Sequence, residues 1–178
     1  MKAIFSYIVS LFAKWHKKAS VVDLMPMSSI GLDRYLGTWY EIARIDHFFE
    51  RGIQDVSAQY TMLKNGDIKV LNSGIKNGHR KQIYGIAKPT KIAGLLKVSF
   101  LRPFYSEYRI LYVDKQYKYA LVGGSSKEYL WFLARKKFLT PNTWKKLMTE
   151  AHSRGYETEQ LIRITHTRKD IHPLSLKM

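Results

Sequence analysis

The sequence of 178 residues contains no cysteine. This absence excludes disulfide bonds, thiolate metal sites and a cysteine nucleophile. It does not reveal the compartment, because a protein without cysteine can work inside or outside the cell. Hydrophobic residues make up 46% of the chain, which is enough apolar material for one folded domain without covalent staples.

Motifs of enzymes and metal sites are missing as well. The sequence has no Gly-x-Ser-x-Gly, no phosphate-binding loop and no His-Glu-x-x-His, and its six histidines lack metal-ligand spacing. Asp46, His47 and Glu50 are the acid–base group that a hydrolase would use. Neighbouring residues on one loop seldom converge, however, and no nucleophile stands near them. We therefore expect no catalysis, no metal and no cofactor.

No apolar run is long enough to cross a bilayer. Residues 3–13 are apolar apart from two serines, whereas a spanning helix needs about 20 residues. The run fits the apolar core of an export signal, which covers about 7–15 residues, although no clean cleavage site follows it. The alternative is a retained segment lying on an anionic membrane, with Trp15 at the headgroup level. Residues 1–20 are thus predicted to be a signal-like or membrane-surface segment, and residues 21–31 a linker.

Acidic residues are few, so the formal net charge is +16. Such a field attracts polyanions and acidic phospholipid surfaces. The basic residues are spread along the chain and never form the run of five or six that marks a nucleic-acid tail. An anionic membrane surface is therefore a candidate partner, and nucleic acid is not expected.

Aromatic residues and a period of two dominate the middle of the chain. Residues 56–62 alternate apolar and polar side chains, as a half-buried strand does. Asn65-Gly66 and Asn77-Gly78 are strong hairpin signals between such runs. Eight short strands at regular spacing predict an all-β fold, an antiparallel up-and-down barrel whose interior can hold one small ligand. The predicted strands cover about residues 39–45, 56–62, 67–72, 80–88, 95–100, 107–113, 117–122 and 129–134.

After the strands the period changes to that of a helix. Trp144, Leu147, Met148 and Ala151 follow the spacing i, i+3, i+4 and i+7. Thr140 can cap the start, Pro141 suits the first helical position and Gly155 suits the stop. One α-helix over about residues 141–154 is therefore predicted to pack outside the barrel.

Three short blocks carry a family resemblance. Gly37-Thr38-Trp39, the pair Asp114 and Tyr117, and Arg135 at the end of a strand resemble the three ordered sequence blocks of the lipocalins. The surrounding residues are most similar to the bacterial outer-membrane lipocalin and apolipoprotein D subgroup. The resemblance covers about residues 32–166 and implies one lipocalin barrel there. Residues 167–178 are predicted to be a C-terminal tail.

The resemblance implies structural roles for the block residues. In the family the tryptophan plugs the closed end of the barrel beneath the arginine, a cation–π contact of about 0.5–2 kcal/mol. Gly37, Trp39, Asp114, Tyr117 and Arg135 are therefore expected to build that end rather than to hold a ligand.

Ligand contacts are expected from the inner strand faces and from four open-end loops. The family places these loops at about residues 46–55, 75–79, 101–106 and 123–128. If Trp39 points inward, strand parity also turns Glu41 and Tyr112 inward, unless a bulge inverts a strand. The predicted ligand-binding residues are Ala43, Phe48, Ala58, Tyr60, Val98, Phe100, Phe104, Tyr105, Tyr108, Tyr129 and Trp131.

The expected function is to bind and transport or store a fatty acid or lysophospholipid in cell-envelope maintenance, as a monomer or weak homodimer. Arg51, Arg102 and Arg109 are candidates to meet a headgroup. Export to the periplasm or envelope membrane is expected. Lipoprotein anchoring is not, since the sequence has no cysteine to acylate. The alternatives are a membrane-associated stress or interaction protein with the barrel as scaffold, and a lipocalin that binds haem or a pigment.

Overall fold

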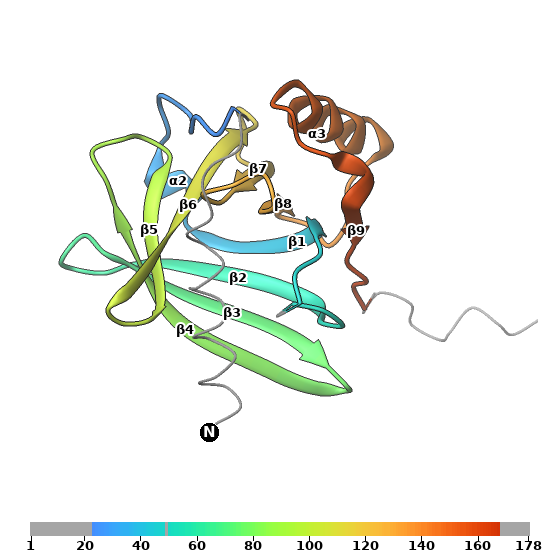
Figure 1. The fold of residues 1–178 in the computed structure, drawn as a ribbon. Helices are drawn as coiled ribbons and strands as arrows, with labels where there is room; N and C mark the ends of the chain where they lie inside the picture. Colours follow the sequence, from blue (N-terminus) through green and yellow to red (C-terminus); the bar gives the residue numbers. More distant parts are fainter. Residues whose placement is uncertain (1–22, 49, 168–178) are drawn as a thin grey trace, which may run out of the picture.

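The computed structural model describes residues 23–48 and 50–167. Their strands form a single antiparallel sheet in the order β2-β3-β4-β5-β6-β7-β8-β1-β9, and β1 pairs also with β2, so that the sheet closes on itself (Figure 1). The predicted eight-stranded up-and-down barrel is confirmed, with β9 as an additional strand beside β1. The predicted signal-like segment and most of the predicted tail lie outside the described residues.

The elements follow the predicted order closely. The strands are β1 (Gly37–Ile45), β2 (Gln54–Met62), β3 (Ile68–Lys76), β4 (His79–Pro89), β5 (Leu95–Leu101), β6 (Phe104–Val113), β7 (Tyr119–Gly123), β8 (Leu130–Ala134) and β9 (Leu161–Arg163). The helices are α2 (Leu32–Tyr35), α3 (Pro141–Ser153) and a 3₁₀ turn at Thr158–Gln160. Thr140 caps α3 by accepting a hydrogen bond from the Thr143 backbone.

The hairpin chemistry is local. Asn77 and Gly78 connect β3 to β4 with φ angles of 51° and 75°. Positive φ at both central residues is what a tight hairpin turn of the right twist requires, and asparagine followed by glycine adopts it at least cost. The turn therefore sets the register in which Lys76 pairs with His79.

Two apolar clusters lie on opposite sides of the sheet. The interior cluster includes Trp39, Val70, Ile110 and Leu133, all buried. The outer cluster joins Leu147 and Ala151 of α3 to the outward faces of β7 and β8, where α3 lies in Figure 1. Segment 23–31, predicted as a linker, packs against the barrel: Met27 donates its backbone N–H to the Ile110 carbonyl at 2.9 Å.

Bulges invert two strands and correct two predictions. In β1, Glu41 pairs with Leu133 but Ala43 pairs with Phe132, so two residues of β1 oppose one of β8. Ala43 therefore belongs to the outer cluster, and the prediction that it faces the ligand is wrong. A second irregularity between Ile110 and Tyr112 likewise turns Tyr112 outward.

Neither helix among residues 23–48 and 50–167 has the length and apolar character of a bilayer span.

Candidate functional site

Arg135 closes one end of the barrel. Its guanidinium carbon lies 3.9 Å from the centroid of the Trp39 ring, which is fully buried. The guanidinium donates hydrogen bonds to the backbone carbonyls of Arg34, Tyr35, Leu36, Thr38 and Tyr117 over distances of 2.8–3.2 Å. One side chain thus ties α2, the start of β1 and the turn after β6 across the barrel end.

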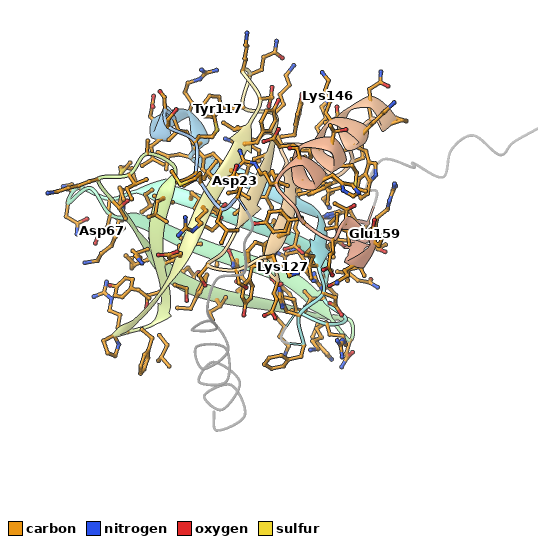
Figure 2. The ribbon with its side chains drawn as sticks, turned by 45° about the horizontal axis from the view of Figure 1, so that its top comes forward. Asp23, Asp67, Tyr117, Lys127, Lys146 and Glu159 are labelled. Carbon is orange, nitrogen blue, oxygen red and sulfur yellow. The ribbon has the colours of Figure 1, made fainter. Side chains whose placement is uncertain are left out.

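The turn between β6 and β7 completes this end. The Asp114 carboxylate accepts backbone hydrogen bonds from Gln116, Lys118 and Tyr119. Tyr117 adopts a φ of 56°, lies beside α2 (Figure 2), and accepts a hydrogen bond from the Gly31 backbone at 2.7 Å. These contacts leave Asp114 and Tyr117 without a path to the interior and serve the turn itself.

Replacing Asp114 with alanine is expected to lower the free energy of unfolding by about 2 kcal/mol, because three turn amides lose a charged acceptor. Urea unfolding measures the difference. Asp114→Asn keeps one acceptor oxygen and should lose less. Equal losses in both variants would contradict the idea that the carboxylate holds the turn.

Six predicted ligand residues line the interior. Tyr60 and Val98 are buried in the interior cluster, and Ala58, Phe100, Tyr108 and Trp131 pack against it while remaining partly accessible. Phe100 lies over Gly85, where a Cβ atom would come within 2.6 Å of its ring. A glycine at this position therefore leaves room for an aromatic side chain on the inner face.

The opposite end, which we call the mouth, consists of the loops at residues 46–53, 77–78, 102–103 and 124–129. Phe48 and Phe104 are 39% and 47% exposed there. Tyr129 stacks on His47 with ring centroids 4.4 Å apart. Burial lowers the pKa of His47 to about 4, so the imidazole is neutral at physiological pH. Aromatic surface is thus present both at the mouth and below it.

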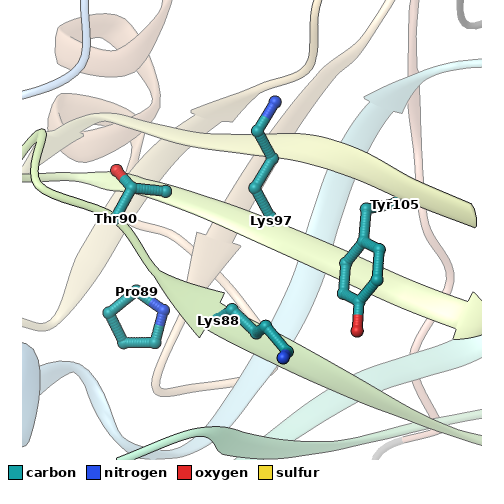
Figure 3. Close-up of a pocket in the computed structure, with 5 residues that line it drawn as sticks. All are labelled: Lys88, Pro89, Thr90, Lys97 and Tyr105. Atoms are coloured by element: carbon teal, nitrogen blue, oxygen red, sulfur yellow. The ribbon is translucent and has the colours of Figure 1, made fainter. Parts of the chain in front are cut away.

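Tyr105 and Arg109 lie outside the barrel, contrary to prediction. β6 begins at Phe104, so Tyr105 is part of a strand, and it lines an outer surface depression of about 390 Å³ with Lys88 and Lys97 (Figure 3). Arg109 is ion-paired with Glu107 on the same outer face. The predicted loop 101–106 shrinks to two residues, and strand parity then directs both side chains away from the interior.

Three phenols form a polar spot inside the barrel. Tyr108 lies 2.7 Å from the Tyr35 hydroxyl, and Tyr60 donates to Tyr108 at 3.0 Å. Burial raises the pKa of all three, that of Tyr60 to about 12. The phenols are therefore neutral and act as hydrogen-bond donors and acceptors.

A charged group below the mouth was missed by the sequence analysis. Arg44, whose side chain is 1% exposed, lies 2.8 Å from Glu41 and 3.8 Å from Glu50, and Trp131 Nε1 contacts Glu50 at 3.4 Å. Burial raises the pKa of Glu50 to about 8, and repulsion from Glu41 adds to this. Arg44 pairs across the sheet with the inward-facing Trp131 because the β1 bulge shifts its parity. Parity alone predicts the reverse.

Among the described residues, no group of three histidine or acidic side chains is arranged to hold a metal ion. The interior therefore offers apolar surface, neutral phenols and the Arg44 group for binding a ligand.

Comparison with known proteins agrees with this architecture. A family model described as a lipocalin-like domain matches residues 30–166. The outer membrane lipoprotein Blc of Vibrio cholerae serotype O1 is 40% identical over 145 residues, which cover 79% of this chain and 85% of that protein. Mouse apolipoprotein D is 34% identical over 140 residues, 72% of each chain.

A solved structure shows the same fold at lower identity. Insecticyanin from the tobacco hornworm Manduca sexta superposes with a TM-score of 0.70 at 19% identity, over 84% of this chain and 87% of that one. The matches and the closed barrel together show that this chain belongs to the lipocalin family, whose members bind or transport small hydrophobic ligands and are not enzymes.

Proposed function

We propose that the chain binds a fatty acid or lysophospholipid inside its barrel and carries or stores it in maintenance of the cell envelope. The relatives named outer membrane lipoprotein support the envelope as the place of work. Export through residues 1–20, or their attachment to an anionic membrane surface, is part of this proposal. So is a monomeric or weakly dimeric state.

The observation that carries the proposal is the partly accessible aromatic and apolar inner face. Ala58, Phe100, Tyr108 and Trp131 are turned to the interior yet not fully covered by other side chains. An acyl chain that covers them leaves water at a gain of roughly 0.8 kcal/mol per buried methylene. Several methylenes suffice to offset the cost of ordering the ligand.

The direct test is displacement of a fluorescent fatty acid from the purified chain, together with mass spectrometry of co-purifying lipids. We expect saturable displacement by fatty acid or lysophospholipid at micromolar concentration. No bound lipid and no displacement would contradict the proposal. Coloured protein would instead favour the haem or pigment alternative. Liposome binding that is lost on deleting residues 1–20, with an empty barrel, would favour the membrane-scaffold alternative.

Ala58→Phe is expected to weaken lipid binding at least about tenfold, because the added ring occupies interior space that the ligand needs. The fluorescent displacement titration measures the change. Gln59→Phe is the matched control, since Gln59 is the exposed neighbour on the outer face of the same strand. Similar weakening in both variants would argue against an interior binding site.

A further inference from the structure

The charge of the barrel interior below the mouth is opposite to that of the whole chain. We call Glu41, Arg44, Asp46, Glu50 and Arg51 the mouth cluster, because ion pairs of 2.8–3.8 Å join them. Three carboxylates there meet two guanidinium groups, whereas the chain carries a formal charge of +16. When all five are ionised, the cluster has one negative charge that no side chain within it compensates.

The uncompensated charge sits on the inner side of the cluster. The Glu41 side chain is 7% exposed, and only its Oε1 atom has a hydrogen-bond partner, Arg44. Glu50 has a single weak contact from Trp131 Nε1 through Oε2. Within the described part of the chain, Glu41 Oε2 and Glu50 Oε1 thus accept no hydrogen bond. A buried carboxylate oxygen without a partner is costly, and a ligand donor would relieve that cost.

Aromatic faces stand beside these oxygens. Trp131 contacts Glu50 and lies 6.1 Å from Tyr129 between ring centroids, with the two rings inclined by 24°. His47 adds a third ring, 4.4 Å from Tyr129 and 6.3 Å from Trp131. Aromatic faces next to a carboxylate are the environment that substituted ammonium groups prefer, through cation–π attraction and charge pairing.

We propose that the space bounded by Glu50, Glu41 and Trp131 receives the ammonium group of an amine-bearing amphiphile whose acyl chain occupies the barrel. This inference rests on the proposed lipid-binding function and narrows its ligand class. A zwitterionic or cationic headgroup is favoured there, and a bare carboxylate is disfavoured. Arg44 does not reverse this preference, because Glu41 and Asp46 already accept hydrogen bonds from its two terminal nitrogens.

The test compares two detergents of equal chain length on the full chain. Dodecyltrimethylammonium has a permanent positive charge, and dodecyl sulfate a negative one. Both are titrated below their micelle concentrations as competitors of a fluorescent fatty acid, at a pH above the Glu50 pKa of about 8. We expect the ammonium probe to bind about tenfold more tightly, although the net charge of the chain favours the sulfate.

Glu50→Gln keeps the shape of the side chain and removes its charge. It should abolish most of the preference for the ammonium probe. Glu107→Gln is the matched control, because Glu107 is ion-paired with Lys97 and Arg109 on the outer face, away from the mouth. It should leave the preference unchanged.

The outcomes separate the two proposals. Equal affinity for both probes, or an undiminished preference in Glu50→Gln, would overturn the ammonium inference while the lipid-binding function stands. Failure of both probes and of the fluorescent fatty acid to bind would overturn both. Loss of the preference in Glu107→Gln would show a surface charge effect and would also overturn the inference.

Discussion

Arg135→Leu is expected to lower the free energy of unfolding by about 3–5 kcal/mol. The substitution removes hydrogen bonds to five backbone carbonyls and the cation–π contact with Trp39. Carbonyls that lose a charged donor cost about 1 kcal/mol or more each where water does not replace it. Urea unfolding followed by tryptophan fluorescence measures the loss.

Arg163→Leu is the control for the ring contact alone. Arg163 also places its guanidinium carbon 3.9 Å from a tryptophan ring, that of Trp144, but it is exposed on the outside of the barrel. We expect a loss of at most about 1 kcal/mol there. If both variants lost the same stability, stacking would account for the effect, and the role of Arg135 in tying the closed end would be refuted.

Glu50→Gln is expected to raise stability above pH 8 by on the order of 3 kcal/mol and to change little near pH 4. Burial raises the native pKa of Glu50 from 4.5 to about 8, and the repulsion from Glu41 adds to this, while Arg44 and Trp131 oppose it. Between these values the unfolded chain ionises and the native chain keeps its proton. Wild-type stability therefore falls as pH rises through this window, by about 1.4 kcal/mol per pK unit before other groups respond.

Urea unfolding at several pH values from about 4 to 9 provides the measurement. Glu107→Gln should behave in the opposite way. Burial tends to raise the pKa of Glu107, but hydrogen bonds and charge from Lys97 and Arg109 outweigh it and lower the pKa. Because Glu107 is partly exposed, its variant should lose no more than about 1 kcal/mol at neutral pH. A Glu50→Gln curve parallel to wild type would mean that Glu50 is not desolvated in the native state.

Much of the fold was predictable because its signals are local. Asn77-Gly78 favours a tight hairpin through its own φ angles, and the cap and apolar stripe of α3 lie within fourteen residues, 140–153. The block residues Trp39 and Arg135 were recognisable from the sequence alone, since their contact is shared by the family they resemble. Side chains ahead of the first bulge, such as Ala58 and Tyr60, also follow simple alternation.

The candidate site was less predictable, because the inner face depends on bulges and strand ends. The two-to-one pairing at Glu41 and Ala43 turns Ala43 outward and Arg44 inward, and with them the charge of the interior. Early entry into β6 likewise places Tyr105 outside. The approach of Glu50 to Trp131 joins positions 81 residues apart.

The sequence by itself determined the strands, their turns, the outer helix and the closed-end plug, because each follows from neighbouring residues or a short block. Only the tertiary structure decided which side chains face the ligand and that a buried arginine with excess carboxylates lies beneath the mouth. The physical reason is that a strand's facing has a period of two, so a single extra residue, placed by pairing with a distant strand, reverses everything beyond it.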